Sequence, residues 1–456
     1  MDAKALVEKQ REYFNTNTTK DPAFRVVQLK KLKALLKASE ARLNTAIYED
    51  FGKSEFETYL TELSQIYHEI DMFVKKVPRW SRRKRVPGSL ANVPSRSYIL
   101  PEPLGTTLVI GAWNYPYNLS LIPALSSLAA GNTVILKPSE LPARTSQVMA
   151  EIINQGFSDA YFHVVEGGVE ETTELLENAF DKVFFTGSIP VGRIIYQKAA
   201  KHLTPVTLEL GGKSPTFVLS GCDIRVAARR IAWAKFLNAG QTCIAPDYVL
   251  VEKEMEAPLL AALKEEIQAR YAPGEDLREN YVQIINERNL ERLAALIDPA
   301  KVYHGGEVNR ATRTISPTLM NGVNFEDPVM EDELFGPILP VIAFSNLDEA
   351  IGKVKERSKP LACYVYAKDR ARIRKVLREV SFGGGAVNDS LMHLSNPNLP
   401  FGGVGASGMG NYHGKAGFRA FTHYKSILDK PTFFEAPLKY WPYAPWKLKL
   451  IRRMFN

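Results

Sequence analysis

The chain contains few cysteines and no long apolar segment. Its three cysteines, Cys222, Cys243 and Cys363, show no CxxC spacing and leave one thiol unpaired. This pattern fits a reducing compartment better than a disulfide framework, so we expect a cytoplasmic protein with a free thiol. No uninterrupted apolar run reaches the roughly 18 residues that a membrane-spanning helix needs. The charged segment from Met1 to Asp21 has no apolar core, which argues against a secretory signal.

The remaining composition is typical of a soluble globular protein, with 45% hydrophobic and 24% charged residues. At 456 residues the chain exceeds the size of one hydrophobic core, so we expect two or more domains. The net charge is +8, and basic residues gather between positions 75 and 85. A solvated helix end explains this cluster, and no recognisable nucleic-acid module surrounds it. We therefore expect no nucleic-acid partner.

The first hundred residues are predicted to be mainly helical. Asp21 and Pro22 are typical of a helix cap and a first turn, and apolar residues follow them at helical spacing. A further helix is expected over residues 56–77. Pro78 and the Pro87–Gly88 pair should interrupt this pattern, and residues 92–100 have an extended character.

From Gly105 onward, short β-branched runs alternate with helical stretches, which is typical of βαβ units. The first series has expected strands at 106–110, 132–136 and 182–186, with helices at 119–129, 143–154 and 191–201. After a strand at 206–210, the second series has strands at 216–219, 247–251, 338–344, 361–366 and 382–387, with a helix at 224–236. The pattern predicts an α/β fold with two α/β domains that meet near Glu209.

Several separated motifs resemble those of the aldehyde dehydrogenase superfamily. LELGGKSP at 208–215 and GQTC at 240–243 match its two active-site signatures. WNYP at 113–116, LKPSE at 136–140, FTGS at 185–188, ELFGP at 333–337 and PFGG at 400–403 follow in the family's order. The short N-terminus, HLTPVT at 202–207 and CIAPDY at 243–248 are similar to the class 3 branch, which acts on fatty and aromatic aldehydes.

This resemblance implies an aldehyde dehydrogenase-like architecture. A Rossmann-type dinucleotide-binding domain would comprise residues 1–80 and 102–208, and an α/β catalytic domain residues 209–389. Residues 81–101 and 390–430 would form a bridging β-hairpin and oligomerisation segment, followed by a tail at 431–456. By the same analogy the protein would be a homodimer.

The resemblance also implies a reaction and its residues, with no metal. Cys243 would attack the aldehyde carbon as a thiolate, so its environment should favour ionisation. The side-chain amide of Asn114 and the backbone N–H of Cys243 would stabilise the oxyanion. After hydride transfer, Glu209 would activate water to hydrolyse the thioester. Taken alone, such residues are more often a buried apolar thiol, a turn-capping amide and a surface carboxylate.

The expected cofactor is NAD, with NADP also accepted by some class 3 relatives. GSIPVG at 187–192 is GxxxxG and not GxGxxG, yet it follows an expected strand and opens a helix, which would offer N–H donors to phosphate. Gly187, Ser188 and Gly192 belong to this turn, and by resemblance Ser188 would lie by the pyrophosphate of the cofactor. Lys137 and Glu140 would approach the adenosine ribose, where a carboxylate disfavours a 2′-phosphate. Glu333 and Phe335 would approach the nicotinamide ribose.

The sequence leaves more than one alternative for the substrate and for the position of the C-terminal tail. Medium- or long-chain aliphatic and aromatic aldehydes fit the class 3 resemblance, and Tyr115, Asn118, Thr242 and His393 are plausible pocket residues or equally structural ones. WPYAPWKLKLIRRMF at 441–455 interleaves aromatic, aliphatic and basic residues. It could lie at a membrane interface as a peripheral contact, cross a substrate entrance, or pack on a subunit.

Two other functions compete with this interpretation. An acylating or phosphate-dependent semialdehyde dehydrogenase is disfavoured by Glu209, because acyl transfer to coenzyme A needs no such base. A binding or structural protein that has lost catalysis is disfavoured by the joint presence of Asn114, Glu209 and Cys243.

Overall fold

A computed structural model describes residues 2–272 and 275–455; residues 1 and 456, the outer limits of the expected first domain and of the tail, lie outside this part. The chain begins with the helices α1 (Ala3–Asn15), α2 (Pro22–Ala38), α3 (Glu40–Phe51) and α5 (Ser64–Trp80). The apolar residues of α1 pack on one face of the first sheet, whereas those of α2, α3 and α5 belong to the core on its other face. The carboxylate of Asp21 caps α2 by accepting from Ala23 N, as its position before Pro22 predicts.

The helix expected at 56–77 is built differently from the prediction. α4 (Glu55–Thr58) continues through a π-helical turn (Tyr59–Leu63) into α5, which runs through Pro78 to Trp80. The expected interruption at Pro78 is wrong because a proline near a helix end removes only one backbone hydrogen bond, and the helix stops within one turn. The π-turn lies beside the candidate site described below.

The first sheet has six strands in the order β17-β7-β6-β3-β4-β5. Its strands are β3 (Thr106–Ile110), β4 (Thr133–Lys137), β5 (Phe162–Val164), β6 (Lys182–Thr186), β7 (Val206–Glu209) and the antiparallel β17 (Gly408–Met409). The other five are parallel and joined by α6 (Pro116–Ala130), α7 (Ala143–Gly156), α8 (Val169–Leu176) and α9 (Ile189–Ala200). The strand order reverses at β3, and ligands bind at such a switch point.

The second sheet has seven strands in the order β10-β13-β14-β9-β8-β15-β16. Its strands are β8 (Pro215–Val218), β9 (Tyr248–Glu252), β10 (Val302–His304), β13 (Thr318–Met320), β14 (Ile338–Phe344), β15 (Ala362–Tyr366) and β16 (Gly384–Val387). The covering helices include α10 (Ile224–Phe236), α11 (Glu256–Arg270), α14 (Leu347–Lys355) and α15 (Arg370–Glu379). The predicted strands at 106–110, 182–186 and 338–344 and the helix at 224–236 are confirmed with these bounds.

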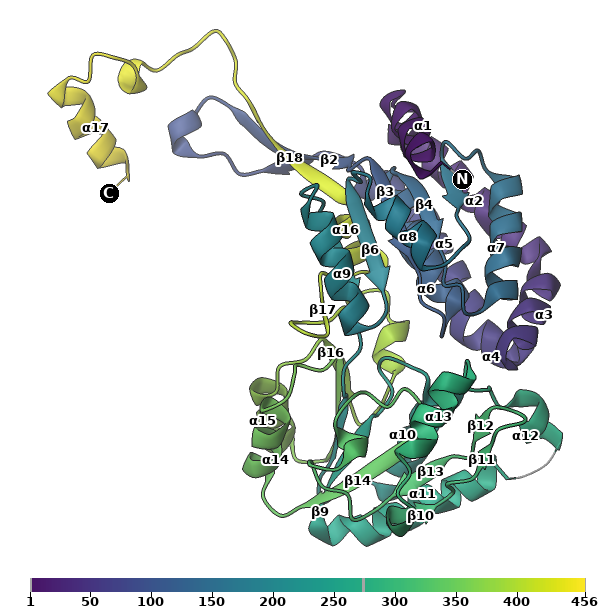
Figure 1. Cartoon of the computed structure of the whole chain (residues 1–456). Coiled ribbons are helices and arrows are strands. Elements are labelled where there is room, and N and C mark those ends of the chain that lie inside the picture. The colour runs from purple at the N-terminus through teal and green to yellow at the C-terminus, as the bar shows by residue number, and fades with distance from the viewer. Residues whose placement is uncertain (1, 273–274, 456) are drawn as a thin grey trace.

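A three-stranded antiparallel sheet projects from the body of the molecule (Figure 1). It joins β1 (Lys84–Val86), β2 (Arg96–Pro103) and β18 (Thr422–Asp429). Of the segment 390–430, residues 408–409 belong to the first sheet and α16 (Gly414–Ala420) packs on α6, so only β18 enters the projecting sheet.

Beyond β18 the chain runs to α17 (Pro445–Phe455), which lies apart from the two α/β layers in Figure 1. Its exposed side chains include Trp446, Leu448 and Leu450. Among the described helices, none is long and apolar enough to cross a membrane.

Candidate active site

Two cavities meet at Cys243. The larger, about 630 Å³, opens at the carboxyl ends of the first sheet and is lined by Ile110, Lys137, Thr186 and Glu209, which end or nearly end their strands. The smaller, about 310 Å³, is lined mainly by apolar side chains. Cys243 belongs to the wall of both. A group bound in one cavity can therefore react with the thiol and with a group in the other.

The larger cavity brings together nearly all of the residues that the sequence placed in the site. Its wall contains Asn114, Lys137, Glu140, Gly187, Ser188, Glu209, Cys243, Glu333 and Phe335. Gly192 is not among the lining residues. A Cβ at this position would lie 2.5 Å from Leu210 Cδ2, so Gly192 allows α9 to pack closely on the chain that follows β7.

Cys243 follows a tight loop in which Asn238, Ala239 and Gly240 all have positive φ, at 54°, 50° and 73°. A side chain at Gly240 would also clash with the carbonyl oxygen of Gly336. Gln241 fixes the loop through its side-chain amide, which donates to Gln283 O at 3.0 Å while its oxygen accepts from Ile285 N at 3.0 Å. The loop is therefore rigid, and it leaves Cys243 partly exposed to both cavities.

Asn114 is buried against this loop. Its Nδ2 donates to Gln241 O at 3.0 Å, and its backbone oxygen accepts from Asn238 Nδ2 at 2.9 Å. An amide nitrogen carries two hydrogens, so the bond to Gln241 O leaves the second hydrogen of Asn114 for another acceptor. The arrangement suits a donor held beside a reacting oxygen.

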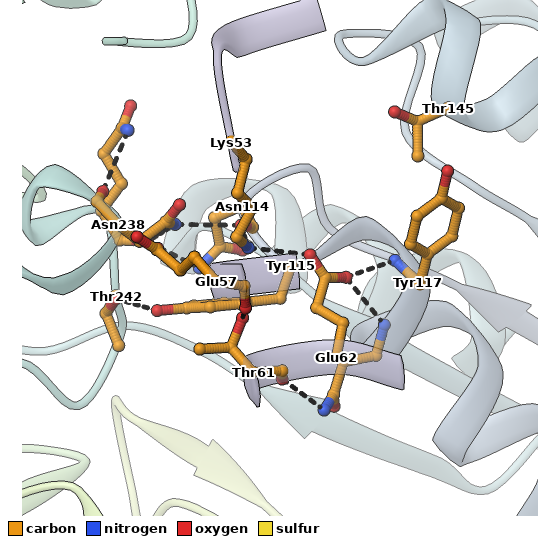
Figure 2. A network of polar contacts seen from close by, with 12 residues as sticks. Lys53, Glu57, Thr61, Glu62, Asn114, Tyr115, Tyr117, Thr145, Asn238 and Thr242 are labelled. Carbon is orange, nitrogen blue, oxygen red and sulfur yellow. Dashed lines mark hydrogen bonds and ion pairs between the residues drawn. The ribbon is translucent and has the colours of Figure 1, made fainter. Parts of the chain in front are cut away.

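A buried ion pair supports the turn that carries Asn114 (Figure 2). Lys53 Nζ lies 2.7 Å from Glu62 Oε1 and 3.5 Å from the backbone oxygen of Asn114, and it lies over the Tyr115 ring at 4.0 Å. The other oxygen of Glu62 accepts from Tyr117 N at 2.8 Å and from Asn118 N, the first turn of α6. Glu62 thereby caps α6, because it satisfies N–H groups that have no partner within the helix.

Tyr115 joins this turn to the cysteine loop, since its hydroxyl lies 2.6 Å from Thr242 Oγ1 (Figure 2). Glu57 lies beside Lys53 and Tyr115 (Figure 2). Burial raises the pKa of the Glu57 carboxyl to about 7, although the positive charge of Lys53 opposes this shift. No sequence signal pointed to Lys53, Glu57 or Glu62, because 61 positions separate Lys53 from Asn114.

The acidic groups around Cys243 are all poorly solvated. Burial, together with the nearby carboxyls of Glu333 and Glu209, raises the pKa of the Cys243 thiol. Burial also raises the pKa of Glu209 well above its ordinary value and that of Glu333 to about 8. The expectation that the surroundings of Cys243 favour ionisation is therefore not met in the free protein, since a buried thiolate would face two carboxyl groups.

Glu209 ends β7 and is 3% exposed, and neither of its carboxyl oxygens has a hydrogen-bond partner among the described residues. Such a group is costly to bury unless a ligand or water completes its bonds. Glu333 reaches the same region because Gly211 has no side chain, and a Cβ there would clash with Glu333 Oε2. Gly211 thus leaves room for the carboxyl group of Glu333 in the wall of the cavity.

The larger cavity fits a dinucleotide. Ser188 precedes α9 and makes no side-chain cap, so the first N–H groups of this helix are available to phosphate oxygens. Val169, 76% exposed at the start of α8, and the exposed Ile194 on α9 give apolar walls for a flat ring. Lys137, whose Nζ donates to Pro138 O at 2.7 Å, and the exposed Glu140 supply polar groups for ribose.

The smaller cavity contains three of the four expected pocket residues, Tyr115, Asn118 and Thr242. His393 does not line it and instead stacks on Phe401, with ring centroids 6.2 Å apart. Other walls come from Leu60, Trp233, Leu237, Leu391 and Met392. Apolar residues of this kind cannot be distinguished in a sequence from ordinary core residues.

The sequence profile of the aldehyde dehydrogenase family matches residues 1–427. The chain belongs to the aldehyde dehydrogenase family. The enzyme is 45% identical to the 4,4'-diaponeurosporen-aldehyde dehydrogenase of Staphylococcus aureus over 97% of both chains. It is 44% identical to the dimeric NADP-preferring aldehyde dehydrogenase of Rattus norvegicus, over 97% of this chain and 98% of the relative.

A solved structure described as the substrate-bound state of Staphylococcus aureus AldH superposes with a TM-score of 0.97 at 43% identity and covers 99% of both chains. The enzyme is therefore a class 3-like aldehyde dehydrogenase, an oxidoreductase that converts aldehydes to acids with NAD or NADP. Its larger cavity is the one suited to the dinucleotide.

Proposed function

We propose that this enzyme oxidises a medium- or long-chain aliphatic or aromatic aldehyde to the free acid through a thioester on Cys243. The observation that carries the proposal is the position of Cys243 in the wall that the two cavities share. The aldehyde would enter the smaller, apolar cavity, where Leu60 and Trp233 favour a hydrocarbon chain or ring. Its carbonyl carbon would then lie between the thiol and the dinucleotide.

The thiol of Cys243 gives its proton to a water molecule, and the thiolate adds to the carbonyl carbon, giving a thiohemiacetal whose oxygen is negatively charged. Asn114 Nδ2 and the backbone N–H of Cys243 donate to this oxygen. A bound nicotinamide ring would supply the hydride acceptor. Because burial opposes ionisation of the free thiol, we infer that thiolate forms only when substrate and cofactor have entered.

Loss of hydride leaves a thioester, which water must attack. Glu209 would accept a proton from this water, and hydrolysis releases the carboxylic acid and restores the thiol. The two unpartnered oxygens of Glu209 support this role. Its raised pKa favours proton acceptance once the carboxyl is ionised.

Purified enzyme tests this proposal directly. NADH absorbance should rise when a fatty or aromatic aldehyde and NAD are added, and Cys243→Ala should abolish the rise. Equal turnover in Cys243→Ala would disprove the assignment of the nucleophile. Acid formation without coenzyme A or phosphate would distinguish hydrolysis from acyl transfer.

We also propose that NAD is preferred to NADP. Glu140 lies at the larger cavity, where a carboxylate would bind ribose hydroxyls and repel a 2′-phosphate. Lys137 in the same wall reduces this repulsion, and one relative is named NADP-preferring. Steady-state kinetics with both cofactors, in the native enzyme and in Glu140→Gln, measure the preference, which should shift toward NADP in the variant.

We infer that two copies associate through the projecting sheet. Among the described strands β18 pairs only with β2, so its other edge is free to add a strand. Sedimentation should give the mass of a homodimer.

The three free cysteines fit the reducing cytoplasm, in which we place the enzyme.

The tail from residue 431 onward is proposed to pack on a subunit near a substrate entrance. α17 combines exposed Trp446, Leu448 and Leu450 with Lys449 and Arg452, which would also suit a membrane interface as a peripheral contact. Removal of residues 431–456 should change KM for long aldehydes. Loss of vesicle binding with unchanged KM would instead support the membrane contact.

A further inference from the structure

Lys182 differs from every other buried lysine in the described chain. It is 6% exposed and makes no hydrogen bond, ion pair or ring contact there. The other buried lysines all have partners: Lys53 with Glu62, Lys137 with Pro138 O, Lys235 with Asp247 and Lys447 with Tyr440 O. Lysine is almost never buried unless it is paired, because a buried ammonium loses its hydration. The ammonium nitrogen of Lys182 is not fully enclosed, so we expect its missing partner in the adjoining cavity.

Lys182 lines a cavity of about 550 Å³ that lies between the starts of β6 and β7, residues 397–400 and α16. Lys415 and Arg419, both exposed on α16, contribute two further positive charges to its wall. None of its lining residues is Asp or Glu. We call this cavity, defined by Lys182, His413, Lys415 and Arg419, the basic hollow.

His413 belongs to the wall of the basic hollow, and its Nε2 is fully enclosed behind that wall. It is 5% exposed, and its buried Nε2 has no hydrogen-bond partner among the described residues. Burial lowers the pKa of its imidazole to about 3, so the ring is neutral at physiological pH and can carry a proton on Nε2. The ammonium of Lys182 therefore has no acceptor at the wall of the hollow, and Nε2 of His413 has none in the interior behind that wall.

The basic hollow is separate from the dinucleotide cavity. Lys182 begins β6 and Thr186, which ends it, lines the larger cavity, so the two sites lie about 13 Å apart along the strand at the usual rise per residue. The His413 ring nevertheless contacts Tyr412, with centroids 4.2 Å apart, and Tyr412 lines both cavities beside Cys243.

We propose that the basic hollow binds a small oxyanion, the carboxylate or phosphate group of a metabolite. Lys182 supplies a compact positive charge at the wall, while Lys415 and Arg419 attract the anion at the mouth. The amide side chains of Asn398 and Asn411 complete a polar wall. Because His413 contacts Tyr412, an anion bound in the hollow would affect the position of Tyr412 in the wall of the substrate cavity.

Titration calorimetry with inorganic phosphate tests the proposal. The enzyme is first saturated with NAD, so that the phosphate-binding turn at Ser188 is already filled. Phosphate should bind with one site per subunit, at least tenfold more weakly in Lys182→Met and severalfold more weakly in Lys415→Met. Lys30→Met, which removes an exposed charge from α2, is the matched control and should bind as the native enzyme does.

Parallel titrations with acetate distinguish carboxylate from phosphate as the bound group, and chloride at equal ionic strength should give no saturable heat. Lys182→Met without phosphate should melt no lower than the native enzyme, since it loses no partner. Equal phosphate binding by Lys182→Met and Lys30→Met would overturn the proposal. The proposal would also be overturned if Lys182→Met or Lys415→Met no longer formed a dimer but bound phosphate as the native enzyme does. A second copy of the chain, and not an anion, would then occupy the hollow.

Discussion

Replacement of Lys53 by Met should damage both stability and turnover, because this side chain supports the turn that carries Asn114. The substitution keeps the length of the side chain but removes its charge. It leaves the fully buried Glu62 with two backbone donors and no counter-ion. Removing one partner of a buried ion pair costs about 3–5 kcal/mol, so the melting temperature should fall clearly.

The effect on turnover should be smaller than complete loss of Asn114. Removal of one oxyanion donor typically lowers kcat by about 10²–10³. Asn238 Nδ2 and Gln241 O still hold Asn114 when Lys53 is lost, so we expect kcat to fall by about tenfold with little change in KM for NAD.

The double variant Lys53→Met/Glu62→Gln separates these two effects. The amide oxygen introduced by Glu62→Gln would still accept from Tyr117 N and Asn118 N without leaving a buried charge, so much of the lost stability should return. The tenfold loss in kcat should remain, because Asn114 O and the Tyr115 ring still lack Lys53. Stopped-flow measurement of NADH formation follows the first turnover, and thermal unfolding follows stability.

Lys33→Met is the control, since it breaks a more exposed pair with Asp71 and should change stability by at most about 1 kcal/mol. A stable double variant with native kcat would refute the idea that Lys53 positions Asn114. A native melting temperature for Lys53→Met would refute the energetic part of the reasoning.

Three further outcomes are expected. Glu209→Gln should keep a burst of NADH but slow the steady state, since acylation needs no hydrolytic base; a missing burst with normal cofactor binding would contradict this role. The rate at which iodoacetamide alkylates Cys243 in the free enzyme should still rise above pH 8.5, near which a free thiol ionises, because burial raises this pKa and thiolate forms only at higher pH. A plateau at lower pH, measured against Cys243→Ala, would show that the thiol is ionised more easily. Gly211→Ala should raise KM for NAD severalfold by displacing Glu333, whereas Gly352→Ala, which has open space around it and no positive φ, should leave KM unchanged.

The sequence by itself determined the alternation of strands and helices and the local signals that bound them. β3, β6 and α10 have the predicted limits because hydrophobic period and neighbouring turn residues act over a few positions. The prediction that Asn114, Glu209 and Cys243 share a site rested on family motifs, and the structure places all three on one cavity. The sequence predicted that the helix ends at residue 77, but α5 continues through Pro78 to Trp80. The free-energy cost of a proline in a helix depends on how many helical residues follow it, which the sequence pattern did not show.

Only the tertiary structure decided what surrounds these residues. The raised pKa of Cys243 arises from burial and from carboxyls on two other segments, and the support of Asn114 comes from Lys53 and from the loop at Asn238. The structure places His393 against Phe401 and outside the smaller cavity, a choice that the sequence left open, and the lack of a partner for Lys182 could not be predicted from the sequence. Residue type and spacing record contacts between near neighbours, whereas burial and pairing depend on segments that folding brings together across more than a hundred positions.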